Sequence, residues 1–540
     1  MSFLKSRSLR NYPVFLIFSI IACAPIWSVR YFVNQDGSGH VYGAWLITQI
    51  LESREPYTQV FQFNFPLFPN SSGHWLIALI LQFAGAFTAT KIMATLTYAG
   101  LVAAVGWLGR ITTGARDLTI HTIFGAVLAF NSLWLVGFYN FNIGLISAVF
   151  GIGLYFRWRE SMDIGRTIGL AVIFLFTFFS HAIAFMILAV AVAVLALLPA
   201  SLFTKRALVL TFAAMIPVGV VAILNKLSSG ASGSFVPIWQ SLNDPYSISD
   251  WINQLRSFDS LVIISRRTFP FVAQESTAFV VFTPLLWIIT GLSLIALASW
   301  PLVKQTKRPW TNSYFPFVVL FAGCMLVALF WPDFLKFDNS TGGILRERVF
   351  LAGLIFLVPL FRFDKSRRWL KRAAIAVFVF VFAYQTVALW EYALRSDRAA
   401  REYLSARPHL ETGTTMTALV FDNTPRRFSS NPINLLDNYF AIDGDVFVWD
   451  NYEFGHYLFP VVMKNDSDRQ FAFDYTTSNT DDLTEDEKLA KLDAVFSKYN
   501  QRIDTLLIWG SNDKLESAFE PYFDSEPYFS NGRVRLYRHR

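Results

Sequence analysis

The sequence predicts a polytopic α-helical membrane protein that ends in a water-facing α/β domain, and three observations support this fold class. Of the 540 residues, 54% are hydrophobic and only 16% are charged, a balance far from that of soluble proteins. Apolar stretches recur along roughly the first 390 residues. Beyond them, acidic and basic residues are closely spaced. We therefore expect a transmembrane helical domain over residues 1–392, with an outer loop over residues 30–90, and an extracytoplasmic α/β domain over residues 393–540.

The apolar stretches predict about eleven transmembrane helices, each about long enough to cross roughly 30 Å of hydrocarbon, some with help from flanking residues. The stretch 74–87 is short for a crossing, at about 14 residues, and is more typical of a re-entrant or interfacial helix. The expected spans are residues 13–27, 92–108, 120–139, 143–156, 167–180, 183–199, 208–224, 279–300, 314–330, 349–360 and 373–390.

The basic residues of the short loops indicate the topology, because lysine and arginine are held on the cytoplasmic side of a membrane. If residues 74–87 do not cross, every basic cluster of these loops falls inside the cell. We then expect a cytoplasmic N-terminus, a retained first membrane helix and an extracytoplasmic C-terminal domain. The clusters are Arg110 and Arg116; Arg157, Arg159 and Arg166; Lys205 and Arg206; Lys304, Lys307 and Arg308; and Arg362, Lys365, Arg367, Arg368, Lys371 and Arg372.

Charge and cysteine content exclude several classes of function. The formal net charge of +7 lies in loops between apolar stretches and not on one exposed face, so we expect no nucleic-acid partner. Cys23 and Cys324 both lie inside apolar segments, so they form neither a disulfide framework nor a thiolate metal site. The chain has no phosphate-loop motif, which weakens any ATP-driven transporter interpretation.

Local patterns in the C-terminal region predict a small α/β unit. Helices are expected over residues 484–499, opened by a Thr cap, and over residues 513–519. A final hairpin over residues 528–537 is expected to turn at Asn531 and Gly532. The other strand candidates are residues 416–421, 446–449 and 503–509.

One candidate for chemistry follows the first apolar helix, where the chain reads NQDGSGHVYGAWLITQILESREPY. Asp36 and His40 are expected at the water edge of the membrane, ahead of an amphipathic helix. The alternative is a structural role, in which Asp36 or Ser38 caps a helix that begins near Gly39.

The order of parts resembles the GT-C glycosyltransferases: a first helix, an Asp just outside it, a long loop with lipid-hugging helices, further crossings and a terminal α/β domain. These membrane enzymes take sugars from polyprenyl-phosphate carriers. The resemblance implies that Asp36, in the DGSGH spacing, acts as the catalytic base or orients the acceptor, with His40 beside it. The segment FPLFPNSSGHWLIALILQFAG looks like the family's juxtamembrane helix, in which His74 and Trp75 either face a lipid phosphate or anchor at the interface.

Positive charge near the departing phosphate is the second requirement of such a reaction. Arg346 and Arg348, in STGGILRERVF, are candidates, since guanidinium groups suit phosphate oxygens. The alternative is a local salt bridge with Glu347. Further outer-side polar residues are candidates for headgroup contacts or for the mouth of the cavity: Arg266, Arg267, His181, Asn140 and Asn142.

In the C-terminal domain, VFVWDNYEFGHYLFP is expected to present Trp449, Asp450 and Glu453 to the membrane cavity as substrate-binding residues, with His456 able to join them. A metal held by Asp36, His40 and a carboxylate of this domain is possible by ligand type, but no spacing demands it. Most families of the GT-C class are described as metal-independent, so we expect no cofactor beyond the donor lipid.

The sequence therefore favours an inverting GT-C-type glycosyltransferase of the cell (inner) membrane. Its expected partners are the lipid bilayer, a polyprenyl-phosphate sugar, and a glycan, lipid or protein acceptor. Two alternatives stay open: a transporter or flippase for a lipid-linked intermediate, and a non-catalytic assembly protein. Transporters usually show charged residues or broken helices at mid-membrane, whereas here the candidate polar residues gather on the outer side.

Overall fold

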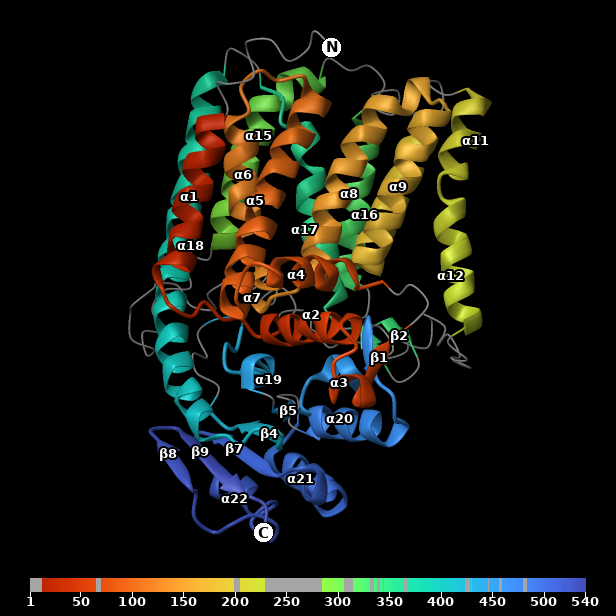
Figure 1. The fold of residues 1–540 in the computed structure, drawn as a ribbon. Coiled ribbons are helices and arrows are strands. Elements are labelled where there is room, and N and C mark those ends of the chain that lie inside the picture. Colours follow the sequence, from red (N-terminus) through yellow and green to blue (C-terminus); the bar gives the residue numbers. More distant parts are fainter. Residues whose placement is uncertain are drawn as a thin grey trace. The chain divides into compact units, whose positions relative to one another are not determined.

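The computed structural model describes residues 12–64, 69–198, 204–228, 284–304, 314–330, 335–337, 340–342, 344–363, 367–422, 428, 430–444, 446–455, 459–478 and 483–540 (Figure 1). The chain divides into two compact units. Unit 1 comprises Met1–Pro25, Thr95–Leu135 and Tyr139–Leu389, and unit 2 comprises Ile26–Ala94, Val136–Phe138 and Trp390–Arg540. The first outer loop thus belongs with the C-terminal region. The predicted boundary at residue 392 falls inside a long helix, close to where unit 2 resumes.

Unit 1 is a bundle of apolar helices. Among the described residues, four helices are long and apolar enough to cross a membrane: Ala86–Thr113, Tyr139–Ser161, Lys205–Leu224 and Arg368–His409. The helices that lie in or run into unit 1 are α1 (Tyr12–Ser28), α5 (Ala86–Thr113), α6 (Thr119–Ala129), α7 (Ser132–Val136), α8 (Tyr139–Trp158), α9 (Ile164–Ser180), α10 (Ala182–Leu197), α11 (Lys205–Ala213), α12 (Ile216–Ser228), α15 (Pro284–Lys304), α16 (Phe315–Phe330), α17 (Leu345–Phe356) and α18 (Arg368–Tyr403). Ahead of α17, β2 (Leu335–Phe337) pairs antiparallel with β3 (Ser340–Gly342).

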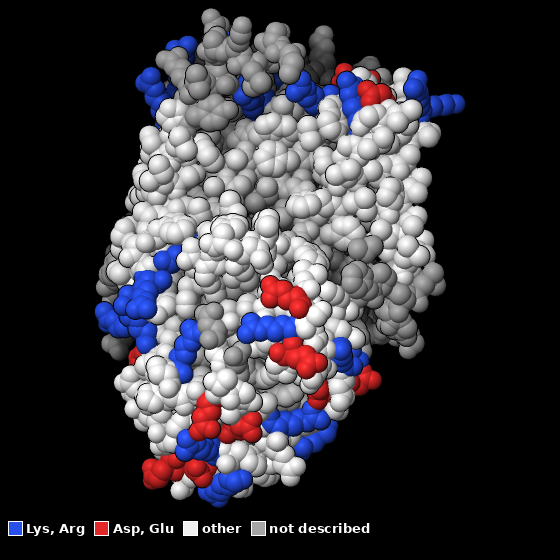
Figure 2. Space-filling view, viewed as in Figure 1, with Lys and Arg blue, Asp and Glu red and all other residues white. Residues whose placement is uncertain are grey.

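The exposed side chains of unit 1 form an apolar surface that suits contact with lipid. On α9 the large apolar residues Ile164, Ile168, Val172 and Phe176 recur every fourth position and are all exposed. Residues four apart lie on one face of a helix, so this stripe needs hydrocarbon around it. Figure 2 shows few charges over the helix flanks in this view, with Lys and Arg side chains at the end of unit 1 that holds the turn between α8 and α9. The predicted polytopic membrane protein is confirmed.

Several predicted crossings are interrupted in the structure, among them 208–224, where α11 ends at Ala213 and α12 begins at Ile216. The span 120–139 is broken, because α6 ends at Ala129 and α7 begins at Ser132. Asn131 causes the break: its side chain accepts a hydrogen bond from the Trp134 backbone N–H at 2.9 Å and donates one to the Leu128 carbonyl at 2.9 Å. This buried amide satisfies helix-end groups that a continuous helix would pair itself. The span predicted over residues 349–360 is α17 followed by a 3-10 turn at Val358–Leu360.

Unit 2 contains the short helices of the first outer loop. These are α2 (Gly37–Leu51), α3 (Tyr57–Val60) and α4 (Ser72–Leu81). With 10 residues, α4 is about 15 Å long at the usual rise of an α-helix, which agrees with the prediction that residues 74–87 do not cross. Between α3 and α4, strand β1 (Phe61–Phe63) pairs antiparallel with β6 (Val461–Met463). This two-stranded ladder was not predicted, and it ties the outer loop to the C-terminal region.

The C-terminal α/β unit is built on a mixed five-stranded sheet of order β5-β4-β7-β9-β8. Strand β4 (Thr415–Val420) runs parallel to β5 (Phe447–Val448) and to β7 (Thr505–Trp509). Strand β9 (Val534–Arg538) is antiparallel to β7 and to β8 (Phe529–Asn531). Every predicted strand is present within a few residues.

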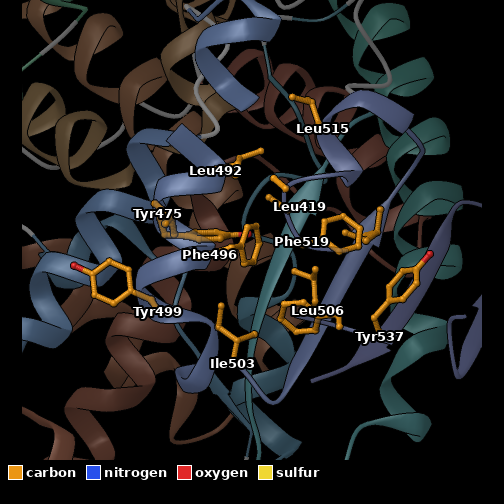
Figure 3. Close-up of a cluster of buried hydrophobic side chains, with 14 of the residues drawn as sticks. Leu419, Tyr475, Leu492, Phe496, Tyr499, Ile503, Leu506, Leu515, Phe519 and Tyr537 are labelled. Atoms are coloured by element: carbon orange, nitrogen blue, oxygen red, sulfur yellow. The ribbon is translucent and has the colours of Figure 1, made fainter. Parts of the chain in front are cut away.

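Helices cover both faces of this sheet. Buried residues of α20 (Asp466–Ser478), α21 (Glu485–Tyr499) and α22 (Asp513–Glu516) pack with Leu506 and Ile508 of β7 in one apolar cluster (Figure 3). On the opposite face, the Tyr403 ring at the end of α18 lies 5.5 Å from the Trp509 ring, centroid to centroid. Helices α20 and α19 (Asn438–Gly444) were not predicted.

Candidate functional site

Helix α2 positions two of the predicted residues. Asp36 precedes its first residue, and His40 follows one turn later, with its backbone N–H donating to the Asp36 carbonyl at 3.0 Å. The Asp36 side chain makes no capping hydrogen bond to the helix. Its Oδ2 instead accepts a hydrogen bond from the Tyr452 hydroxyl at 3.1 Å. The capping alternative therefore does not explain this carboxylate, which is only 6% exposed.

A 3-10 turn, η9 (Tyr452–Gly455), supplies the groups that face α2. Tyr452 contacts Asp36, and the next residue, Glu453, contacts His40: Glu453 Oε1 lies 2.5 Å from His40 Nδ1. The residue before them, Asn451, donates from Nδ2 to the Gly39 carbonyl at 3.2 Å and accepts the Glu453 backbone N–H at 3.0 Å. Three consecutive residues thus fix η9 to the first turn of α2.

Helix α4 completes the cluster with His74. Its Nε2 lies 2.9 Å from Glu453 Oε2 and 3.4 Å from His40 Nδ1. On the other side of the ring, Nδ1 lies 3.1 Å from the Asn70 carbonyl oxygen. His40, His74 and Glu453 are 4%, 1% and 1% exposed. We call these three residues the His–Glu–His cluster.

Burial and charge act in opposite directions on this cluster. Burial alone would raise the pKa of Glu453, but electrostatic attraction to His74 and His40, with hydrogen bonds from both, lowers it to about 2. Burial would lower the pKa of His40, but the charge and hydrogen bond of Glu453 and the charge of Asp36 raise it. Glu453 is therefore a carboxylate, and Asp36 is close enough to act electrostatically on His40.

The cluster has the composition of a metal site. The candidate ligand atoms of the three residues all lie within 4.8 Å of one another. Two imidazoles and a carboxylate are ligands that suit zinc and related divalent ions. The sequence showed no metal-binding motif for these three residues, because they lie far apart along the chain.

The structure brings Asp36, His40, His74 and Glu453 together, but it places Trp449 and Asp450 elsewhere. Trp449 donates from its ring N–H to the Arg502 carbonyl at 3.0 Å and packs against the apolar cluster of the C-terminal unit. The Asp450 carboxyl is turned to the carboxyl of Asp437, which is also buried. Their roles in substrate binding stay predictions.

Arg346 and Arg348 belong to unit 1, at the start of α17, and both are buried. The Arg348 guanidinium lies 5.2 Å from the centroid of the Phe141 ring, which in turn lies 5.3 Å from the His181 ring. Of the other predicted polar residues of unit 1, Asn140 and Asn142 lie in the first turn of α8 and are buried. A cavity shared by Asp36 with Arg346 and Arg348 stays a prediction.

The interfacial residues predicted in α4 behave differently from each other. Trp75 is 44% exposed, as an anchor requires, whereas His74 is enclosed against Glu453 and is not an anchor. Three further candidates, Arg266, Arg267 and His456, lie outside the described residues. Sequence reasoning missed Asn451 and Tyr452 as site residues, although both stand inside the aromatic motif that it singled out.

No family model and no curated protein matches this sequence. Among solved structures, the chain is similar to ArnT from Cupriavidus metallidurans bound to undecaprenyl phosphate, at a TM-score of 0.43 and 11% sequence identity. The similarity covers 98% of this chain and 97% of that chain. At this identity and TM-score, the reaction has to be argued from the residues of this chain.

Proposed function

We propose that this chain is a membrane glycosyltransferase of the GT-C type, which moves a sugar from a polyprenyl-phosphate carrier to an acceptor at the extracytoplasmic face. The observation that carries the proposal is the Asp36 carboxylate, which is buried, plays no part in capping α2 and accepts a hydrogen bond from Tyr452. Burying a carboxylate costs desolvation energy, and buried, hydrogen-bonded carboxylates cluster at functional sites.

In the proposed reaction, the acceptor hydroxyl attacks the anomeric carbon of the donor sugar. Asp36 takes the proton of that hydroxyl, the new bond forms between the acceptor oxygen and the anomeric carbon, and the bond from that carbon to the phosphate oxygen breaks. The phosphate leaves with the bonding electron pair, and attack on the opposite face inverts the anomeric configuration. Arg346 and Arg348 are proposed to bind the departing phosphate, because buried guanidinium groups neutralise phosphate charge through paired N–H donors.

We propose that the protein lies in a bacterial inner membrane. In this orientation the N-terminus faces the cytoplasm and the C-terminal region lies on the extracytoplasmic side. Support comes from the Lys and Arg side chains that gather at one end of unit 1 (Figure 2), since basic residues are retained on the cytoplasmic side. The proposed partners are the bilayer, the polyprenyl-phosphate sugar and a glycan, lipid or protein acceptor.

The test is a transfer assay on the purified full chain with a panel of polyprenyl-phosphate sugars, comparing wild type with Asp36→Asn. General-base catalysis contributes roughly 10²–10⁴ to a rate, so the substitution should lower turnover by about that factor. Asp493→Asn is the matched control, because Asp493 is an exposed carboxylate on α21 and its replacement should leave turnover unchanged.

The same assay separates the rival functions. Turnover that survives Asp36→Asn would refute the base role. A flippase would move labelled lipid-linked sugar across a proteoliposome membrane without forming a new glycosidic bond, so a translocation assay in parallel identifies that function. A chain with neither activity would fit the assembly protein.

A further inference from the structure

One of the three distances between ligand atoms in the His–Glu–His cluster already matches that of a zinc site. Two ligand atoms that each lie about 2.1 Å from a tetrahedral zinc ion are about 3.4 Å apart. The separation of His40 Nδ1 and His74 Nε2 is 3.4 Å. The two histidine-to-glutamate distances, 2.5 and 2.9 Å, are those of hydrogen bonds, and a bound ion would widen them by about 0.9 and 0.5 Å.

The hydrogen-bond partners of His74 leave a lone pair facing the cluster. Its Nδ1 faces the carbonyl oxygen of Asn70, which can only accept, so Nδ1 carries a proton. In the neutral ring, Nε2 then presents a lone pair toward the Glu453 carboxylate, which is also an acceptor. A second ring proton or a bound cation must then lie between these two acceptors. A divalent ion meets that need for Glu453 and for both imidazoles at once.

Residues next to the cluster fix its ligands by hydrogen bonds, as residues around a metal site usually do. A metal-bound histidine usually donates its second ring N–H to a carbonyl or carboxylate, and His74 does so to Asn70. The Glu453 backbone is fixed by Asn451, which also binds the carbonyl of Gly39.

Helix α2 leaves room for the cluster at Gly43. A Cβ at this position would lie 2.9 Å from Glu453 Oε2 and 3.2 Å from His74 Cδ2. Any larger residue would push the carboxylate and the imidazole out of their present positions.

We propose that His40, His74 and Glu453 bind one zinc ion, with a fourth coordination position left for water or a substrate oxygen. Three protein ligands of the His₂Glu type with an open position are the pattern of zinc sites that take part in reactions, whereas structural sites use four protein ligands. The ion joins α2, α4 and η9, three elements that are distant in sequence. It would lie one helical turn from Asp36 along α2 and one residue from Tyr452 along η9, so it positions the Asp36–Tyr452 pair. That role in positioning rests on the proposed glycosyl transfer, whereas zinc binding itself is argued from the cluster alone.

The first experiment measures metal content. The full chain is purified in detergent with an affinity tag free of histidine, stripped with a chelator, equilibrated with micromolar Zn²⁺, passed over a desalting column and analysed by plasma mass spectrometry. Wild type should hold about one zinc ion per chain, and His74→Gln and Glu453→Gln should lose most of it. Asp36→Asn and His409→Gln are controls that should keep it, since neither removes a ligand.

The second experiment needs no substitution and so does not depend on the variants folding. X-ray absorption spectroscopy of zinc-loaded wild type should show nitrogen and oxygen ligands, with the scattering pattern of two imidazoles. Folded wild type that retains no zinc would overturn the proposal, as would full retention in His74→Gln or a spectrum without imidazole. Because Asp36→Asn is expected to hold zinc while losing transfer, failure of the metal site and failure of the proposed reaction give different results.

Discussion

The Tyr452 hydroxyl lies 3.1 Å from Oδ2 of Asp36, although the two residues are 416 positions apart in the chain. Tyr452→Phe removes this donor and keeps the ring, which packs edge-on against Phe459. If Asp36 acts on the acceptor, its carboxylate loses an orienting contact, and kcat should fall roughly 10-fold, the usual value of a hydrogen bond to a charged group. Steady-state kinetics with the donor lipid that the transfer assay identifies measures this change.

The KM for the donor distinguishes positioning from a general loss of structure. It should stay the same in Tyr452→Phe, since Tyr452 is expected to touch the base and not the donor. An unchanged kcat would contradict the positioning role, and a parallel loss of thermal stability would indicate a structural role instead.

The close approach of Gly43 to the His–Glu–His cluster predicts opposite outcomes for two glycines of the same helix. Gly43→Ala places a methyl group 2.9 Å from Glu453 Oε2, and overpacking of this kind costs about 1–3 kcal/mol. At Gly39, a Cβ would lie 3.3 Å from the Leu435 side chain and 3.4 Å from Asn451, which small shifts relieve. Gly39→Ala should therefore be near neutral, helped by the helix propensity of alanine, worth about 1 kcal/mol.

Thermal unfolding of the two variants in the same detergent gives the comparison. Gly43→Ala should unfold several degrees below Gly39→Ala. Equal midpoints would mean that Glu453 and His74 relax away from the added methyl group at little cost, and that the cluster is not closely packed.

Features set by neighbouring residues could be predicted from the sequence. Thr484 and Glu487 form the capping box that opens α21, with each side chain bound to the other's backbone. The final hairpin turns directly after Asn531, where Gly532 has a φ of 59°. Both depend on two to four adjacent residues, so no other part of the chain is needed to recognise them.

Features set by residues distant in the chain could not be predicted from the sequence. His74 looked like an interfacial anchor because the sequence does not show that a carboxylate 379 positions later encloses it. Strand β1 has three residues and becomes a strand only by pairing with β6. The predicted span 120–139 included Asn131 without a break. A single amide in an apolar run does not show that it will bind the chain's own backbone. Asp36 was a candidate from its place just after the first apolar helix, and only its catalytic role came from the family resemblance.

The buried pair of Asp437 and Asp450 predicts a pH-dependent stability. Burial raises the pKa of both carboxyl groups, and the negative charge of Asp437 raises that of Asp450 further, well above its usual value. The titratable groups that face the pair are the buried tyrosines Tyr42, Tyr403 and Tyr475. Carboxyl groups that bind each other need a proton between them.

The sign of the effect follows from the raised pKa. The pair contributes its full stability below the pKa of the unfolded carboxyls, and this contribution is lost as pH rises toward the folded pKa. Asp450→Asn supplies a permanent donor to Asp437, so it should unfold at a higher temperature than wild type at pH 8. The difference should shrink toward pH 4. Thermal unfolding midpoints measured from pH 4 to pH 8, with Asp493→Asn as control, test this prediction. If Asp450→Asn were less stable than wild type at pH 8, the two carboxyl groups would not share a proton.

Phe496 lies at the centre of the apolar cluster between α21 and the sheet, with no exposed surface (Figure 3). Its ring packs against those of Tyr475, Phe519 and Phe523, at centroid distances of 6.5, 6.2 and 5.9 Å. Phe496→Ala should destabilise unit 2 by about 3–5 kcal/mol through the lost contacts and the cavity left behind, and Phe496→Leu by less. Hydrogen exchange of β7 backbone amides in the full chain reports this loss locally. None of the His–Glu–His ligands lies in β7, so zinc content should stay near the wild-type value in Phe496→Leu. Loss of zinc there would show that the cluster depends on the α/β core and not on α2, α4 and η9 alone.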